Sequence, residues 1–222
     1  MGWVYSCFLC LDLPQDFAGT VTRSQAWDRL EKEGRVANQA TTLSKQEHKK
    51  KKSLIKRFNK INTKSWEEET DMYPGIIEAI QQMLYDDEGI FVVDTHSKGA
   101  FHADISVAHH KDGRLPYSLL YFIELKMPKY KLNTSENSGQ ILDYFNAIYE
   151  KQPNRSKFVV ILSNFQESWV YIANYSYNSV AINKQCILEF ADAIIYADQL
   201  SKTHYPSKIP ELDNKFGSEY DI

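Results

Sequence analysis

Residues 117–127 are apolar on nearly both faces until the run reaches Glu124 and Lys126. A run of this kind is typical of an interior strand in a sheet that is covered on both sides. Because alternate residues of a strand point to opposite faces, Glu124 and Lys126 share one face, and Ile123 and Leu125 share the other. A charged side chain in an interior strand is costly unless it is paired or bound to a metal ion. The run therefore predicts a covered sheet with a charged site in it.

The segments around this run alternate between strand-like and helix-like patterns. Further strands are predicted where Val, Ile, Phe and Tyr concentrate between breaks, at residues 90–95, 101–108, 157–165 and 168–174. Apolar residues at helical spacing predict helices over residues 66–87, 135–151 and 187–200. The first of these helices begins or kinks at Pro74. The order α-β-β-β-α-β then predicts an α/β fold, with a mixed sheet of about five strands flanked by helices.

Composition and charge divide the chain into three parts. The 222 residues are 43% hydrophobic and 25% charged, which is typical of a globular protein and excludes wholesale disorder. Residues 45–64 hold nine Lys or Arg and one Glu, so this short segment is strongly basic while the chain as a whole carries −3. We expect a polar, basic extension over residues 1–65, one domain over 66–200 and a tail over 201–222. No apolar run approaches the roughly 20 residues that span a bilayer, so no membrane contact is expected.

Asp104, Glu124 and Lys126 are candidate catalytic residues. The apolar members of residues 101–107 alternate, so Asp104 projects from the opposite face in the middle of its predicted strand. Two neighbouring strands would then place two carboxylates and an ammonium on one side, and Mg²⁺ takes one or two protein carboxylates while keeping several waters. The ammonium could orient an attacking water and stabilise charge on a phosphate. The alternative is that Glu124 and Lys126 form a surface ion pair on an amphipathic strand.

Asp104, followed after a loop by Glu124-Leu125-Lys126, resembles the motif of the PD-(D/E)xK nuclease superfamily, with Ala103 where the motif often has Pro. The resemblance implies a restriction-endonuclease-like fold and hydrolysis of phosphodiesters that depends on Mg²⁺ or Mn²⁺. It also implies that Asp104 and Glu124 bind the metal ion and that Lys126 positions the water. The implied substrate is nucleic acid, in this case DNA.

Two further stretches extend the resemblance to residues 66–175. Gln140 and Tyr144 are similar to the Q-x-x-x-Y helix motif of the RecB-like exonuclease branch, in which they hold the substrate phosphate or the lysine. Because they are four residues apart, they share a helix face. Residues 69–74 resemble the Crinkler-type effector nuclease domains of fungi and oomycetes. This last likeness implies an effector that is secreted or translocated and acts in a nucleus.

A further Glu on the first helix often faces the metal ion in this superfamily. Glu78 lies roughly 160–200° around the helix from Ile76 and Ile80, on the solvent side. Glu69, extrapolated back through Pro74, falls within about 40° of the apolar face. We therefore expect Glu69, rather than Glu78, to be the third metal ligand.

The basic segment supplies candidate phosphate ligands, namely Lys49, Lys50, Lys51 and Lys52. A run of this kind predicts a nuclear address or a phosphate-contacting arm, and a solvated helix is the alternative. The three cysteines are an odd number, which is typical of a reducing compartment inside the cell rather than of a disulfide framework. For the whole protein, the alternative to an enzyme is a catalytically silent nuclease-fold module that binds DNA or host proteins.

Overall fold

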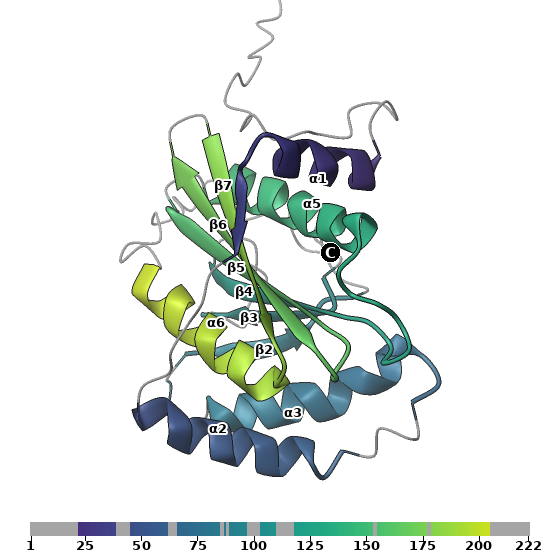
Figure 1. Ribbon diagram of the computed structural model, residues 1–222. Coiled ribbons are helices and arrows are strands. Elements are labelled where there is room, and N and C mark those ends of the chain that lie inside the picture. Colours follow the sequence, from purple (N-terminus) through teal and green to yellow (C-terminus); the bar gives the residue numbers. More distant parts are fainter. Residues whose placement is uncertain are drawn as a thin grey trace, which may run out of the picture.

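A seven-stranded mixed sheet runs through the molecule, with helices on both of its faces (Figure 1). The structure is a computed structural model that describes residues 22–38, 45–61, 66–84, 87, 89–96, 103–109, 118–152, 155–176 and 179–204. The strands are β1 (Val36–Asn38), β2 (Phe91–Asp94), β3 (Ile105–Ala108), β4 (Leu119–Leu125), β5 (Lys157–Ser163), β6 (Ser168–Ser176) and β7 (Ser179–Ile187). The helices are α1 (Arg23–Lys32), α2 (Lys45–Phe58), the short 3₁₀ helix η2 (Glu69–Met72), α3 (Tyr73–Met83), α5 (Ser135–Lys151) and α6 (Phe190–His204).

The strands lie in the order β1-β7-β6-β5-β4-β3-β2. The pairs β1–β7 and β4–β5 are parallel, and the remaining neighbours are antiparallel. The expected α/β class with a mixed, helix-flanked sheet is confirmed, and the expected succession α-β-β-β-α-β runs from α3 to β5. The strand number of about five is wrong, because β1 and β7 were not predicted. Asn183, Lys184 and Gln185 give β7 a weak strand signal, yet β7 pairs with β6 along its whole length.

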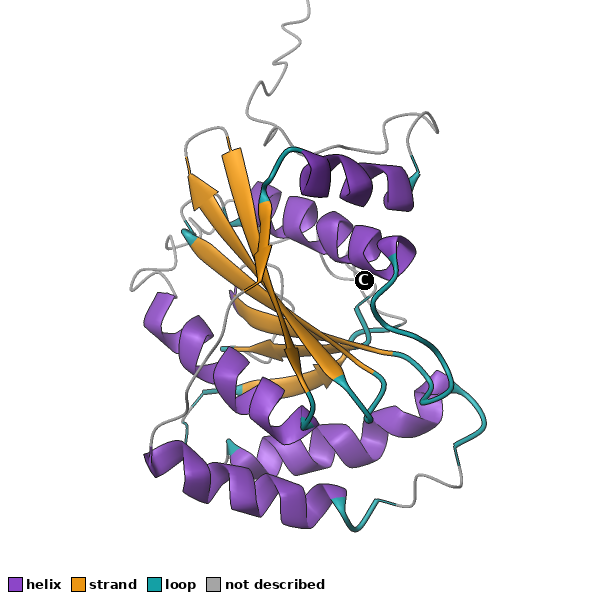
Figure 2. Cartoon of the chain, viewed as in Figure 1, coloured by secondary structure: helices purple, strands orange, loops and turns teal. Residues whose placement is uncertain are grey.

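Helices α2, α3 and α6 cover one face of the sheet, and α1 and α5 cover the other (Figures 1 and 2). Two apolar cores follow from this arrangement. The first includes Ile105 and Ile123 beneath α3 and α6, and the second includes Phe122 and Phe158 beneath α5. Because β4 contributes side chains to both cores, all seven residues of this strand are buried. This confirms the interior strand that the sequence predicts.

Local sequence signals fix the helices next to the site. Helix α3 begins at Tyr73 with Pro74 in its first turn, where a missing N–H is tolerated. Helix α5 covers the predicted residues, and the Thr134 side chain caps it by accepting from the Asn137 N–H. None of the described helices is long and apolar enough to cross a bilayer.

The predicted polar extension contributes core residues to the sheet domain. In α2, Leu54 and Phe58 are buried in the same core as α3, so packing continues across residue 65. Helix α1 lies so close to α5 that a Cβ added to Gly139 would come within 2.2 Å of the Arg23 carbonyl oxygen. At the other end, α6 continues to His204, past the predicted start of the tail at residue 201. Residues 1–21 and 205–222 lie outside the described residues.

Candidate active site

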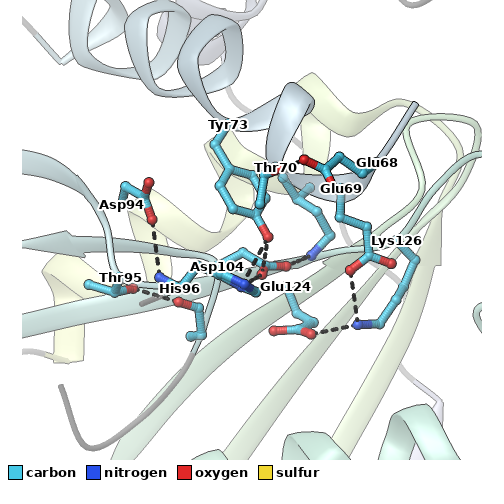
Figure 3. Close-up of polar contacts among 12 residues, drawn as sticks. Glu68, Glu69, Thr70, Tyr73, Asp94, Thr95, His96, Asp104, Glu124 and Lys126 are labelled. Atoms are coloured by element: carbon cyan, nitrogen blue, oxygen red, sulfur yellow. Dashed lines mark hydrogen bonds and ion pairs between the residues drawn. The ribbon is translucent and has the colours of Figure 1, made fainter. Parts of the chain in front are cut away.

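Asp104 and Glu124 stand next to each other at the ends of two neighbouring strands (Figure 3). In the antiparallel pair β3–β4, Ile105 lies opposite Ile123, so the register carried one residue further sets Asp104 opposite Glu124. Both residues are 2% exposed. The sequence predicts Asp104 in the middle of a strand, which is wrong, because β3 begins only at Ile105. The structure places the two carboxylates on the same side of the sheet, as the sequence predicts.

Three groups from different elements hold Asp104. The backbone N–H of Leu125 donates to Oδ2 at 2.6 Å, and the Tyr73 hydroxyl donates to Oδ1. His96 Nδ1 lies 3.2 Å from the same Oδ1 and 3.3 Å from the Tyr73 hydroxyl oxygen. Since Leu125 follows Glu124 directly, the bond from its N–H fixes Asp104 against the end of β4.

The surroundings of Asp104 change its affinity for a proton. The pKa of Asp104 is raised to about 6, mainly by burial and further by the negative charge of Glu124. The hydrogen bonds from Tyr73 and from the Leu125 N–H, and the charge of Lys126, lower the pKa of Asp104 and only partly offset burial. Like charges that are buried side by side repel each other, and a positive charge placed between them relieves the repulsion.

Glu124 accepts hydrogen bonds from three side chains. Lys126 Nζ donates to Oε1 at 2.7 Å, Gln140 Nε2 donates to the same oxygen at 2.8 Å, and the Tyr144 hydroxyl donates to Oε2 at 2.6 Å. Gln140 Nε2 also lies 2.9 Å from the Tyr144 hydroxyl oxygen, because both residues project from the same face of α5. Their predicted partner was the substrate phosphate or the lysine, whereas in the structure both donate to the Glu124 carboxylate.

Lys126 is a largely buried cation. Its side chain is 18% exposed, and its backbone N–H donates to the Ser163 carbonyl of the parallel strand β5 at 2.8 Å. Burial lowers the pKa of Lys126, but the negative charges of Glu124 and Glu69 outweigh it, and the pKa ends above its ordinary value. Lys126 is therefore protonated at neutral pH, and it offers the site a positive charge and N–H donors.

Glu69 reaches the site from the 3₁₀ helix ahead of α3. Its Oε2 lies 3.7 Å from Lys126 Nζ. Asp71 holds the start of this short helix, since its Oδ2 accepts from the backbone N–H groups of Glu67 at 2.8 Å and Glu68 at 3.1 Å. The same two hydrogen bonds lower the pKa of Asp71. Glu69 thus lies beside Lys126 in the structure, and its expected role as a third metal ligand stays a prediction.

Glu78 lies on the outer side of α3, as the helical angle predicts. It is exposed and accepts a hydrogen bond from Gln82 Nε2 at 3.0 Å, one turn further along the helix. The sequence reasoning missed Tyr73 and His96, however. Tyr73 has a signal that could have been used, because a buried tyrosine hydroxyl usually finds a partner. His96 lies just after β2, and its nearness to Asp104 follows only from the β2–β3 pairing.

The four lysines of the basic run divide into two pairs. Lys50 Nζ lies 3.0 Å from Asp87, and Lys51 Nζ lies 2.6 Å from Asp192 and 3.2 Å from Glu189. Both therefore hold α2 against neighbouring parts of the domain. Lys49 and Lys52 are exposed on the same helix. Of the predicted phosphate ligands, these two point to solvent.

The buried carboxylates of Asp104 and Glu124 suit a hard divalent cation. Within the described part of the chain, no three His, Cys, Asp or Glu side chains converge into a complete metal-binding set. Mg²⁺ does not need such a set, because it is held by one or two carboxylates and completes its shell with water and substrate oxygens. The like-charge repulsion that helps to raise the pKa of Asp104 is the observation that favours a cation at this position.

Comparisons of the chain with family models, with curated proteins and with solved structures find no match. The function therefore has to be argued from the geometry of the site alone.

Proposed function

We propose that this protein is a metal-dependent phosphodiester hydrolase that acts on nucleic acid, with DNA as the substrate and Mg²⁺ or Mn²⁺ as the cofactor. The observation that carries the proposal is the convergence of Asp104, Glu124 and protonated Lys126 at the adjoining ends of β3 and β4. Two buried carboxylates with an ammonium beside them match the requirements for binding a divalent cation and a phosphate at one point. The resemblance to the PD-(D/E)xK superfamily rests on the same three residues.

In this proposal Asp104 and Glu124 would hold the metal ion, which supplies Lewis-acid polarisation of the phosphate and activation of a water. Hydrolysis joins the oxygen of water to phosphorus and breaks the bond from phosphorus to the leaving oxygen, which takes up a proton. Lys126 places its ammonium beside this centre and stabilises the negative charge that develops on the phosphate oxygens. Because Lys126 is already protonated, we assign it to orientation and charge stabilisation rather than to proton abstraction.

The residues around the two carboxylates keep them in position. Tyr73 and the Leu125 N–H hold Asp104, while Gln140 and Tyr144 hold Glu124. Hydrogen bonds of this kind around a metal-binding carboxylate fix its orientation, and their loss typically lowers activity or metal affinity about 10- to 100-fold. Gln140 and Tyr144 are thus positioning residues in this mechanism.

The order of elements supports a restriction-endonuclease-like core within the larger sheet. The succession from α3 through β2, β3 and β4 to α5 and β5 brings a helix, two strand ends and a second helix to the same point. Strands β1, β6 and β7 extend the sheet beyond β5 and do not contribute to the candidate site.

The deciding experiment is cleavage of plasmid, linear duplex and single-stranded DNA by the purified chain in Mg²⁺, in Mn²⁺ and in EDTA. We expect cleavage in either metal ion, none in EDTA, and a loss of at least about 100-fold in Asp104→Ala. Asp94→Ala is the matched control, because Asp94 is exposed, lies close to the site at the end of β2, and bonds only to the backbone N–H of His96 among the contacts of the described residues.

Cleavage in EDTA, or full activity in Asp104→Ala, would refute the mechanism. DNA binding without turnover in any metal ion would favour the second candidate, a catalytically silent module. The observation in favour of that candidate is that every carboxylate oxygen of Asp104 and Glu124 already accepts a hydrogen bond from the protein.

A further inference from the structure

The segment between Lys126 and α5 carries an exposed aromatic side chain. Residues 127–134 connect the end of β4 to the N-cap of α5. Tyr130, in the middle of this loop, is 50% exposed, and Leu188 is the only other large hydrophobic residue in the described part of the chain that is exposed. A single exposed apolar residue is common on protein surfaces, so only its surroundings can indicate that it binds a ligand.

The backbone of the loop is fixed, so Tyr130 is held outward rather than left on a free segment. The Tyr130 N–H donates to the Met127 carbonyl at 2.9 Å, and Asn164 Nδ2 donates to the Tyr130 carbonyl at 2.9 Å. Asn164 is itself 4% exposed. Further along, Asn137 Nδ2 of α5 donates to the carbonyl of Leu132 at 3.1 Å, and Leu132 is fully buried. The loop is therefore tied to the β5–β6 turn and to α5.

Lysines flank the exposed ring on both sides. Lys129 and Lys131 are exposed, and Lys129 Nζ lies 5.2 Å from the centre of the Tyr130 ring. The ring has an ammonium near it, and half of the Tyr130 surface remains accessible to a flat partner. The combination of an exposed aromatic ring and neighbouring cations is the one that proteins use to bind unpaired nucleotides, since the ring stacks on a base while the cations contact phosphates.

The position of this loop connects it to the candidate active site. Tyr130 is four residues from Lys126, so their Cα atoms are within about 14 Å of each other, and the Met127–Tyr130 turn shortens that reach. A base in a duplex already has both faces covered by its neighbours. An exposed ring near the site therefore selects a base that is not stacked within a helix.

We propose that Tyr130 stacks on an unpaired base, with Lys129 and Lys131 on the adjoining phosphates, and that the site acts on nucleic acid with a single-stranded segment. The proposal rests on the nuclease function proposed above, and it names the form of the substrate. Tyr130 is a binding residue in this scheme and takes no part in the chemistry at Asp104 and Glu124.

The test is equilibrium binding of a fluorescently labelled single-stranded oligonucleotide and of the same sequence as a duplex, in EDTA so that no turnover is needed. We expect tighter binding of the single strand, and a loss of roughly five- to hundredfold in Tyr130→Ala that is much smaller for the duplex. Tyr130→Trp should retain binding and Tyr130→Leu should not, because only the aromatic ring can stack. Leu188→Ala is the matched control and should bind as the wild type does.

The lysines give an independent readout. Affinity falls as salt rises, so the slope of log affinity against log salt is negative. Replacing Lys129 and Lys131 together by Ser should make this slope less negative by up to about 1.4, since each single-strand phosphate contact contributes about 0.7. Equal binding by Tyr130→Leu and wild type, no preference for the single strand, or no binding of either oligonucleotide would overturn the stacking proposal. Binding that depends on Tyr130 without cleavage in Mg²⁺ would uphold it and refute the nuclease function, so the two failures are distinct.

Discussion

Two clusters of buried or partly buried charged side chains in the described part of the chain differ in their balance of charge. The active-site cluster, Glu69, Asp104, Glu124 and Lys126, has three carboxylates for one lysine. The α6 cluster has two carboxylates for two lysines. Its ion pairs join Lys202 to Asp198 at 2.8 Å, Lys202 to Asp87 at 2.7 Å and Lys50 to Asp87 at 3.0 Å.

We infer that this difference separates a candidate cation site from a cluster that stabilises the fold. In the α6 cluster each carboxylate is bonded to at least one ammonium, and the pairs join α2 and α6 to Asp87, which follows α3 in the chain. In the active-site cluster, Asp104 is bonded to none of the described lysines and faces Glu124 instead. An excess of buried negative charge destabilises a protein unless another positive charge is supplied. We therefore expect the active-site cluster to respond to metal ions and the α6 cluster to govern stability.

Replacing the lysine of each cluster gives the largest contrast. Lys126→Met should lower DNA cleavage by at least about 100-fold, because it removes the charge beside the reacting phosphate. Lys202→Met should leave cleavage within about twofold of wild type and lower the free energy of unfolding by about 1–3 kcal/mol, since it leaves two carboxylates without their shared partner. Cleavage rates and urea unfolding of both variants measure the contrast. Equal losses of activity in both variants would break it.

Mg²⁺ should stabilise the protein through the active-site cluster alone. At ten times its dissociation constant a ligand adds about 1.4 kcal/mol, which raises the melting temperature of a domain of this size by roughly 3–5 °C. The wild type and Asp198→Asn should show this increase, and Asp104→Asn should lose it. Thermal unfolding with MgCl₂, against NaCl of the same ionic strength, measures the effect. An increase that persists in Asp104→Asn would place the metal ion elsewhere.

The sequence predicts the parts of the site that depend on local periodicity. Strand alternation places Glu124 and Lys126 on one face, and the helical angle selects Glu69 over Glu78, in agreement with their positions in the structure. The first inference needs only the alternation of β4 and the residue that follows it, and the second extends the helical angle of α3 back into the adjoining η2. The range of helix α5 follows in the same way, from its apolar face.

What the sequence does not predict depends on contacts between distant segments. His96 meets Asp104 because β2 and β3 pair in one register, and Lys51 meets Asp192 because α2 packs beside α6. Strand β1 has only three residues and becomes a strand by pairing with β7, more than 140 positions later. Periodicity within a short window contains no information on such partners. The sequence of the basic run therefore does not predict the ion pairs that its lysines form with distant carboxylates.

The smallest expected effect lies within the α6 cluster, where the two carboxylates respond to pH with opposite sign. Burial raises the pKa of Asp198, and Lys202 offsets this only in part. Its Oδ1 is also buried without a hydrogen-bond partner in the described part of the chain. Burial alone would raise the pKa of Asp87 as well, but its bonds to Lys202 and Lys50 outweigh burial and lower that pKa.

These opposite shifts predict opposite changes in stability with pH. An acid whose pKa is raised on folding binds its proton more tightly in the folded state, so its contribution falls as the pH rises above the unfolded value of about 4. An acid whose pKa is lowered on folding stabilises the folded state above its unfolded pKa. This stabilisation is lost as the pH falls through the lowered pKa of the folded state. The melting temperature of Asp198→Asn relative to wild type should therefore rise from pH 4 towards neutrality. The melting temperature of Asp87→Asn relative to wild type should fall as the pH rises from about 3 to 5. Each kcal/mol of changed stability should shift either melting temperature by about 2–4 °C. Two curves that move in the same direction would show that the lysines do not distinguish the two carboxylates, and that the cluster is not balanced in the way its ion pairs indicate.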